Sequence, residues 1–150
     1  MESRTLQLAL FALLAVPLAA RAVEPVNQTT FGGVAIDGYD PVAYFEDGAA
    51  IEGSKEWTAE WNGATWRFAS AEHRDLFVAD PEAYAPRYGG YCAWAVSMGS
   101  TAGVDPEAWT VRDGKLYLNY NKSVQEKWRA DADAAIERAD ANWPGLVDPD

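Results

Sequence analysis

The sequence predicts an α+β fold, with a small antiparallel sheet of two hairpins packed with a short central helix and a longer C-terminal helix. Three observations support this class. Two tight-turn signals, Asn62-Gly63 and Asp113-Gly114, separate segments rich in aromatic and apolar residues. A capped segment at 71–78 has the length of a short helix. Apolar residues recur at spacings of three and four over 124–139, which indicates a longer helix.

The first 22 residues predict a cleaved signal peptide. Arg4 precedes an apolar run without charges from Leu6 to Ala20, and Ala20-Arg21-Ala22 fits the small-x-small cleavage rule. The run is too short for a membrane span, which needs about 20 apolar residues. We therefore expect a periplasmic or secreted protein whose mature chain begins at Val23 and has no membrane span.

The mature chain is strongly acidic and holds one cysteine. Removing residues 1–22 leaves 10 basic and 22 acidic residues, a net charge of −12. This charge argues against nucleic acid and anionic membranes as partners. A single cysteine, Cys92, excludes an internal disulfide, so the thiol must be buried, bound to something or paired between chains. The seven tryptophans supply a large aromatic area for one compact domain.

The segment before the first hairpin predicts little regular structure. Residues 23–32 are expected to form a flexible arm, followed by one domain over 33–144. A short strand is expected near 34–36. The pair Asp40-Pro41 predicts one helical turn, because aspartate is a good cap and proline suits the first helical position. A loop over 48–54 then leads into the hairpin.

The first hairpin and the helix after it carry the only histidine. A two-residue turn at Asn62-Gly63 sets the register so that three pairs face each other: Trp61 with Ala64, Ala59 with Trp66, and Trp57 with Phe68. Ser70 is expected to cap a helix over 71–78. Helical spacing places three side chains on one face of it: His73, Leu76 and Phe77. Asp80-Pro81 should end this helix and open a short turn that carries Tyr84.

The second half of the chain predicts a second hairpin and the C-terminal helix. Gly89-Gly90 lets the backbone approach another group closely. The apolar segment 93–98 is either a buried strand or a helical turn, and its pattern leaves both open. The hairpin over 109–120 should pair Trp109 with Leu118 and Val111 with Leu116.

The C-terminal helix has a predicted start and end. Ser123 and Glu126 form a capping box at its start. It should end near Asn142, just before Trp143-Pro144, because proline interrupts helices. Residues 145–150 are expected to be a loose acidic tail.

Several short motifs resemble those of the YHS domain, in particular its exported bacterial branch. They are the run from Phe68 to His73 followed by Phe77, Pro81 and Tyr84; the run Asp40 to Phe45; Tyr88 to Cys92; and Gly114 to Tyr120. The resemblance covers about Gly33 to Pro144. It implies handling of heavy metals through cysteine ligands. Here, however, the three cysteine positions hold Ala43, Ala69 and His73, so the usual thiolate site is absent.

Three residues are candidate metal ligands: His73, Cys92 and Met98. The resemblance places His73 where related sequences keep a ligating cysteine, and imidazole binds borderline metals. Cys92 with His73 could hold copper or zinc, with Met98 as a soft third ligand. The alternative is structural, with a packed histidine, a buried thiol and a core methionine. Nearby aromatic residues could line a small-molecule pocket or simply pack in the core: Tyr88, Tyr91 and Trp94.

The sequence therefore supports three hypotheses of function. The first is a non-enzymatic module that binds a metal ion, copper or zinc, near His73 and Cys92. The second is a ligand-free structural module or one that binds a protein partner, because two of the family's cysteine positions are alanine. The third is a thiol enzyme that uses Cys92 as nucleophile and His73 as base, which requires an accessible sulfur. The first hypothesis is preferred.

Overall fold

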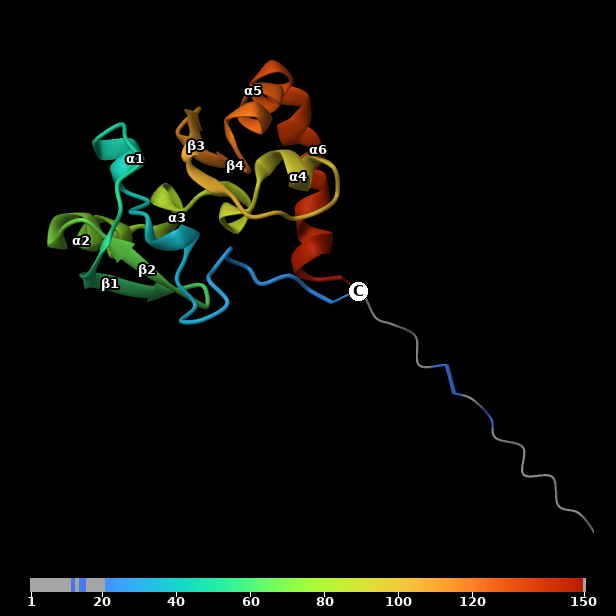
Figure 1. Ribbon diagram of the computed structural model, residues 1–150, viewed down its shortest axis with the longest axis horizontal. Helices are drawn as coiled ribbons and strands as arrows, with labels where there is room; N and C mark the ends of the chain where they lie inside the picture. Colours follow the sequence, from blue (N-terminus) through green and yellow to red (C-terminus); the bar gives the residue numbers. More distant parts are fainter. Residues whose placement is uncertain (1–11, 13, 16–20, 150) are drawn as a thin grey trace, which may run out of the picture.

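The computed structural model describes residues 12, 14, 15 and 21–149. The predicted α+β class is confirmed, with two separate antiparallel two-stranded sheets and six α-helices in this part of the chain (Figure 1). Most of the predicted signal peptide, 1–22, lies outside the described residues. Among the described residues, every helix is too short or too polar to cross a membrane.

The first sheet pairs β1 (Ser54–Trp61) with β2 (Ala64–Phe68) around the predicted Asn62-Gly63 turn. Both turn residues have positive φ, 50° and 79°, as a two-residue hairpin turn of this kind requires. The predicted pairs next to the turn are confirmed, Trp61 with Ala64 and Ala59 with Trp66. The third predicted pair is wrong, because a register shift in β1 brings Ser54 rather than Trp57 opposite Phe68.

The central helix α2 (Ala71–Ala79) begins where the sequence predicts, and α3 (Pro81–Tyr84) follows it. The Ser70 side chain accepts a hydrogen bond from the backbone N–H of His73 at 3.1 Å, which confirms the predicted cap. Phe77 is fully buried against the aromatic rings of the first hairpin. The sequence predicts that Leu76 shares the inner face of α2 with His73 and Phe77. Leu76 is instead 40% exposed, so it lies at the edge of that face.

The second sheet pairs β3 (Asp105–Arg112) with β4 (Lys115–Asn119), and its predicted register near the turn is confirmed. The segment that could have been strand or helix is the short helix α4 (Ala93–Ser97). Two 3₁₀ turns, η1 (Ile36–Gly38) and η2 (Arg87–Gly90), complete the irregular regions. A strand does not form near 34–36, where only isolated bridges occur.

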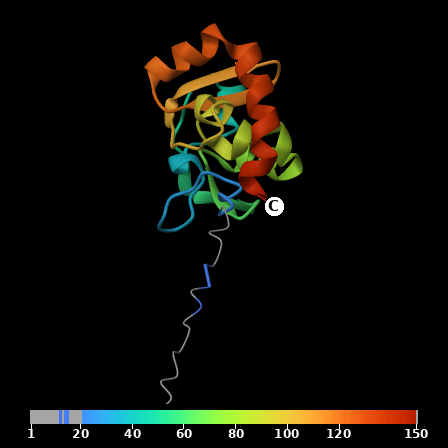
Figure 2. The same cartoon turned by 90° about the vertical axis from the view of Figure 1, so that its right-hand side faces the viewer.

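The predicted C-terminal helix is two helices, α5 (Lys122–Ala130) and α6 (Ala132–Val147). Asp131 interrupts the helix with a non-helical φ of −133°. The helices on its two sides run in different directions (Figure 2). The side chain of Asn121, rather than the predicted Ser123, caps α5 by accepting from the Val124 N–H at 2.8 Å. The predicted end near Asn142 is also wrong, because α6 continues past Pro144 to Val147.

The N-terminal segment 23–32, predicted to be a flexible arm, is packed against the rest of the fold through several of its residues. Val26 is fully buried. The backbone N–H of Asn27 donates to Gly89 O at 2.8 Å, and its side-chain amide donates to Gly90 O at 3.0 Å. The backbone N–H of Val23 donates to Leu146 O at 3.0 Å. This hydrogen bond links the N-terminal segment to residues 145–150, which were predicted to be a loose tail. Buried apolar area and these hydrogen bonds offset the entropy that a free arm would keep.

Two hydrophobic cores stabilise the fold, and β4 contributes to both, with Leu116 and Leu118 in the first and Tyr117 in the second. The first lies around the first hairpin, α1 (Ala43–Glu46) and α2, and its largest fully buried side chains include Trp66, Phe68 and Phe77. The second lies among β4, α4, α5 and α6, and includes Tyr117, Trp128 and Ala135. Large aromatic side chains thus fill both cores, as the composition predicts.

Buried tyrosines predict a loss of stability in alkali. The pKa values of Tyr44, Tyr88 and Tyr117 are raised above the usual value near 10, and burial is the largest cause of each increase. Because the folded-state pKa exceeds the unfolded one, the stabilisation is complete below about pH 10 and is lost as the pH rises further. We expect the urea concentration at the unfolding midpoint to fall above about pH 10. Tyrosinate absorbance should rise over the same pH range. A midpoint that stays constant as the pH rises above this value would contradict the expected contribution of Tyr44, Tyr88 and Tyr117.

Candidate functional site

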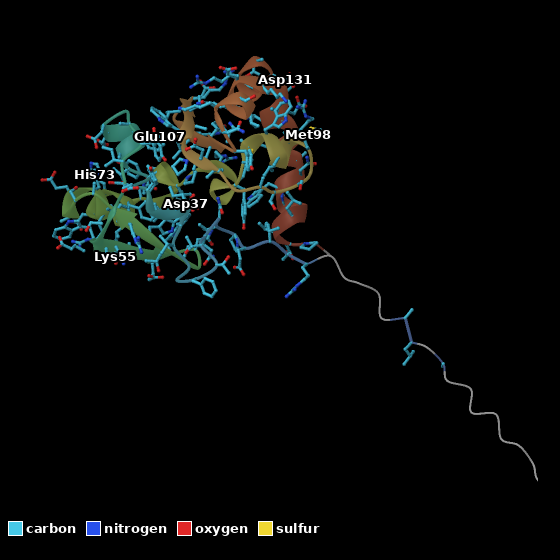
Figure 3. All side chains as sticks on the ribbon, in the orientation of Figure 1. Asp37, Lys55, His73, Met98, Glu107 and Asp131 are labelled. Atoms are coloured by element: carbon cyan, nitrogen blue, oxygen red, sulfur yellow. The ribbon has the colours of Figure 1, made fainter. Side chains whose placement is uncertain are left out.

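The most distinctive polar arrangement in the fold is built around His73. Its place in the first turn of α2 is fixed by the Ser70 cap. The Nδ1 atom of the imidazole lies 2.6 Å from the Oδ2 atom of Asp40, although 33 residues separate the two in sequence. Figure 3 shows His73 at the edge of the molecule that carries α2. The side chain is 14% exposed, so one part of the ring still reaches the surface.

Asp40 is fully buried and joins two parts of the chain. Its Oδ1 accepts hydrogen bonds from the backbone N–H groups of Val42 at 2.8 Å and Ala43 at 3.3 Å. Its Oδ2 accepts from the Ala69 N–H at 2.8 Å and contacts the His73 ring. The predicted helical turn after Asp40 forms and Asp40 bonds to its backbone, but α1 begins at Ala43 with Val42 as its N-cap, so the predicted start at Pro41 is wrong. The contact of Asp40 with His73 was not predicted, because local sequence carries no signal for a pairing over this separation.

A second carboxylate lies on the other side of the imidazole. Asp47 directly follows α1, and its Oδ2 lies 3.6 Å from the Nε2 atom of His73. Its side chain is 45% exposed. A carboxylate beside Nδ1 favours the proton on that nitrogen in the neutral ring, so Nε2 presents its lone pair toward Asp47. With the ring in this tautomer, Nε2 is the nitrogen that could bind a metal ion.

Cys92 is sealed inside the protein at 1% exposure, immediately before α4. Its thiol donates a weak hydrogen bond to the Oδ1 atom of Asn119 at 3.6 Å. Asn119 is itself fully buried, and the same oxygen accepts from the Trp94 N–H at 3.1 Å. The cysteine is therefore packed as a small apolar residue with a polar neighbour.

Met98 follows α4 and is 68% exposed, so it is not a core residue. In Figure 3, His73 and Met98 lie at opposite ends of the molecule. The polar neighbours of His73 and of Cys92 are different residues, two aspartates for the first and Asn119 for the second. In the described part of the chain, no group of three or more His, Cys, Asp or Glu residues could hold a metal ion. His73 and Met98 therefore do not converge, whereas metal binding by His73 or Cys92 stays a prediction.

The aromatic residues near the glycine pair divide between core and cleft. Tyr88 is buried between Tyr117 and Trp143, with ring centroids 6.1 and 6.2 Å away. Tyr91 also packs on Trp143, whereas Trp94 lies under the guanidinium of Arg138. A cleft of about 760 Å³, here called the aromatic cleft, is lined by Pro25, Val26, Trp61, Asn62, Trp66, Glu82, Ala85, Pro86, Arg87, Tyr88, Gly89, Asp140, Trp143, Pro144 and Val147.

Comparisons with models of protein families, with curated proteins and with solved structures find no match for this chain. The resemblance to the YHS domain therefore depends on the short motifs alone.

Proposed function

We propose that this protein is an exported, non-enzymatic module that binds a copper or zinc ion at His73, with Asp47 as the second protein ligand. The observation that supports this most is the 2.6 Å contact between Nδ1 of His73 and the buried carboxylate of Asp40. Histidines that bind metals usually donate their other ring N–H to a carboxylate or carbonyl, which fixes the ring and raises its basicity.

The spacing of the two outer donors suits one ion. Zinc binds nitrogen at about 2.0–2.1 Å and carboxylate oxygen at about 2.0–2.2 Å, so a tetrahedral ion separates two such donors by about 3.3–3.4 Å. The Nε2 atom of His73 and the Oδ2 atom of Asp47 are 3.6 Å apart. A small movement of the exposed Asp47 side chain would bring both within bonding distance. Water or a donor from another molecule would fill the remaining positions.

The donor types favour Zn(II) or Cu(II) over Cu(I). Imidazole and carboxylate are borderline and hard ligands, and the soft ligands that Cu(I) prefers are sulfurs. The thiol of Cys92 is buried beside Asn119, and Met98 lies far from His73. The proposal therefore keeps the predicted histidine and metals but replaces the two predicted sulfur ligands with Asp47.

The second candidate is a structural module that binds a protein partner and no metal. Asp40 already accepts hydrogen bonds from three backbone N–H groups, so its contact with His73 can serve the fold alone. Helix α2 also exposes two apolar side chains that a partner could contact, Leu76 by 40% and Val78 by 60%, although residues two apart do not share one helix face. The thiol-enzyme hypothesis gains no such support, because a catalytic sulfur must be accessible and Cys92 is 1% exposed.

Calorimetric titration of the untagged protein with zinc and copper salts tests the proposal. We expect binding with one ion per chain, and His73→Gln should abolish it. Asp40→Asn should weaken it about 10- to 100-fold, the usual effect of losing the partner that orients a ligating histidine. Cys92→Ala and Met98→Leu are matched controls and should leave the affinity unchanged.

Two results would change the assignment. Affinity that falls in the sulfur variants and not in His73→Gln would return the site to Cys92 and Met98. Absence of metal binding in the folded wild-type protein would favour the structural module.

A further inference from the structure

The aromatic cleft lies where the two hydrophobic cores meet the N-terminal segment. Trp61 and Trp66 on its wall pack with the first core, whereas Tyr88 and Trp143 pack with the second. Its volume of about 760 Å³ falls within the range of small-molecule sites, about 300–1,000 Å³. It shares no residue with the pair formed by Asp40 and His73. The cleft is therefore a second candidate site, independent of the proposed metal site.

The polar groups of the cleft leave carboxylate oxygen available. The hydroxyl of Tyr88 donates to the Oδ1 atom of Asp140 at 2.9 Å, and the Arg87 guanidinium reaches the same oxygen at 3.4 Å. Neither donor uses the Oδ2 atom of Asp140, whose side chain is 47% exposed. Glu82 on α3 adds a second exposed carboxylate to the lining. The charged side chains of the cleft, Glu82, Asp140 and Arg87, carry one net negative charge.

We propose that the aromatic cleft binds a small organic cation, an ammonium or quaternary ammonium group attached to an apolar body. Indole rings attract cations at their faces, and recognition of quaternary ammonium groups commonly uses aromatic walls. Trp66 and Tyr88 are buried, so the partly exposed rings of the cleft are the indoles of Trp61 and Trp143. The Oδ2 atom of Asp140, which accepts no hydrogen bond from the described residues, and the Glu82 carboxylate add attraction for a positive charge. An organic anion is disfavoured, because Arg87 is already paired with Asp140 and the whole chain carries a net charge of −11.

A comparison of three probes with the same aromatic ring tests the sign of the charge. Benzyltrimethylammonium, benzyl alcohol and benzenesulfonate would each be titrated into the full chain, with binding followed by the NMR signals of the tryptophan indole N–H groups. The cation should bind most tightly and should shift the Trp61 and Trp143 signals. Equal or tighter binding of benzenesulfonate, or no shift with the cation, would overturn the proposal.

Charge variants inside and outside the aromatic cleft test where the cation binds. Asp140→Asn keeps an oxygen for Tyr88 and should weaken cation binding about three- to fivefold, the scale of an exposed charge pair. Glu82→Gln should act in the same direction. Asp133→Asn is the matched control, because it removes the same charge from the same helix outside the aromatic cleft. Equal losses for Asp133→Asn and Asp140→Asn would show general attraction to an acidic surface and would overturn the proposal.

The ring variant and the metal-site variant complete the test. Trp143→Leu should weaken the cation about tenfold while leaving benzyl alcohol less affected, since only the cation uses the ring face electrostatically. His73→Gln should leave cation binding unchanged, so failure of the metal proposal and failure of this one are distinguishable. An equal loss of the cation and benzyl alcohol in Trp143→Leu would contradict recognition of charge.

Discussion

Replacing Asp40 with alanine is expected to lower the free energy of unfolding by about 3–5 kcal/mol. The change removes the acceptor of three backbone N–H groups, those of Val42, Ala43 and Ala69, and leaves the His73 ring without its partner. A buried donor left without an acceptor costs about 1–3 kcal/mol, and losing one partner of a buried pair costs about 3–5 kcal/mol. Urea unfolding followed by circular dichroism measures the difference.

The matched variant for Asp40→Ala is His73→Gln. Glutamine keeps a side-chain N–H that can donate to Asp40, and the three backbone N–H groups keep their acceptor. The cost should therefore be about 1–2 kcal/mol, close to that of a single hydrogen bond. Comparable losses in the two variants would mean that the imidazole, and not the backbone contacts of Asp40, stabilises this region. That outcome would weaken the case that His73 is available for a ligand.

Features encoded by a few neighbouring residues could be predicted from the sequence. The Asn62-Gly63 and Asp113-Gly114 turns need positive φ at positions that few residues tolerate, so both hairpins and their register near the turn follow from local chemistry. The Ser70 cap follows for a similar reason, because a side-chain oxygen at that position satisfies a free N–H of the first turn.

Features that depend on distant contacts could not be predicted. The register shift in β1 lies away from the turn, so the pair Trp57 with Phe68 had no local constraint. Asp131 separates α5, which contacts β3 and β4, from α6, which contacts mainly α4, and helical periodicity does not encode these long-range contacts. At the candidate site, His73 could be singled out as the only histidine, whereas its partner Asp40 is 33 residues away.

Replacing Gly89 with alanine is expected to have the other large effect, about 3–5 kcal/mol of stability. A Cβ atom at Gly89 would lie 2.0 Å from the carbonyl oxygen of Pro25, so the N-terminal segment could not keep its position. The residue also has φ 61°, which costs alanine about 1–2 kcal/mol. Displacing the segment would expose Val26, whose burial contributes about 1.5–3 kcal/mol, and would break the hydrogen bond from Asn27 N to Gly89 O.

Gly63→Ala separates these causes, because Gly63 also has positive φ, at 79°, but a Cβ there meets nothing within 4 Å. It should lose only the backbone term, about 1–2 kcal/mol. Hydrogen exchange of the Asn27 amide should accelerate in Gly89→Ala and stay slow in Gly63→Ala. If both variants lost the same stability and kept the Asn27 amide protected, close contact between Gly89 and the N-terminal segment would not be what stabilises this half of the fold. The N-terminal segment would then stay in place, and the aromatic cleft would keep the wall that Pro25 and Val26 provide.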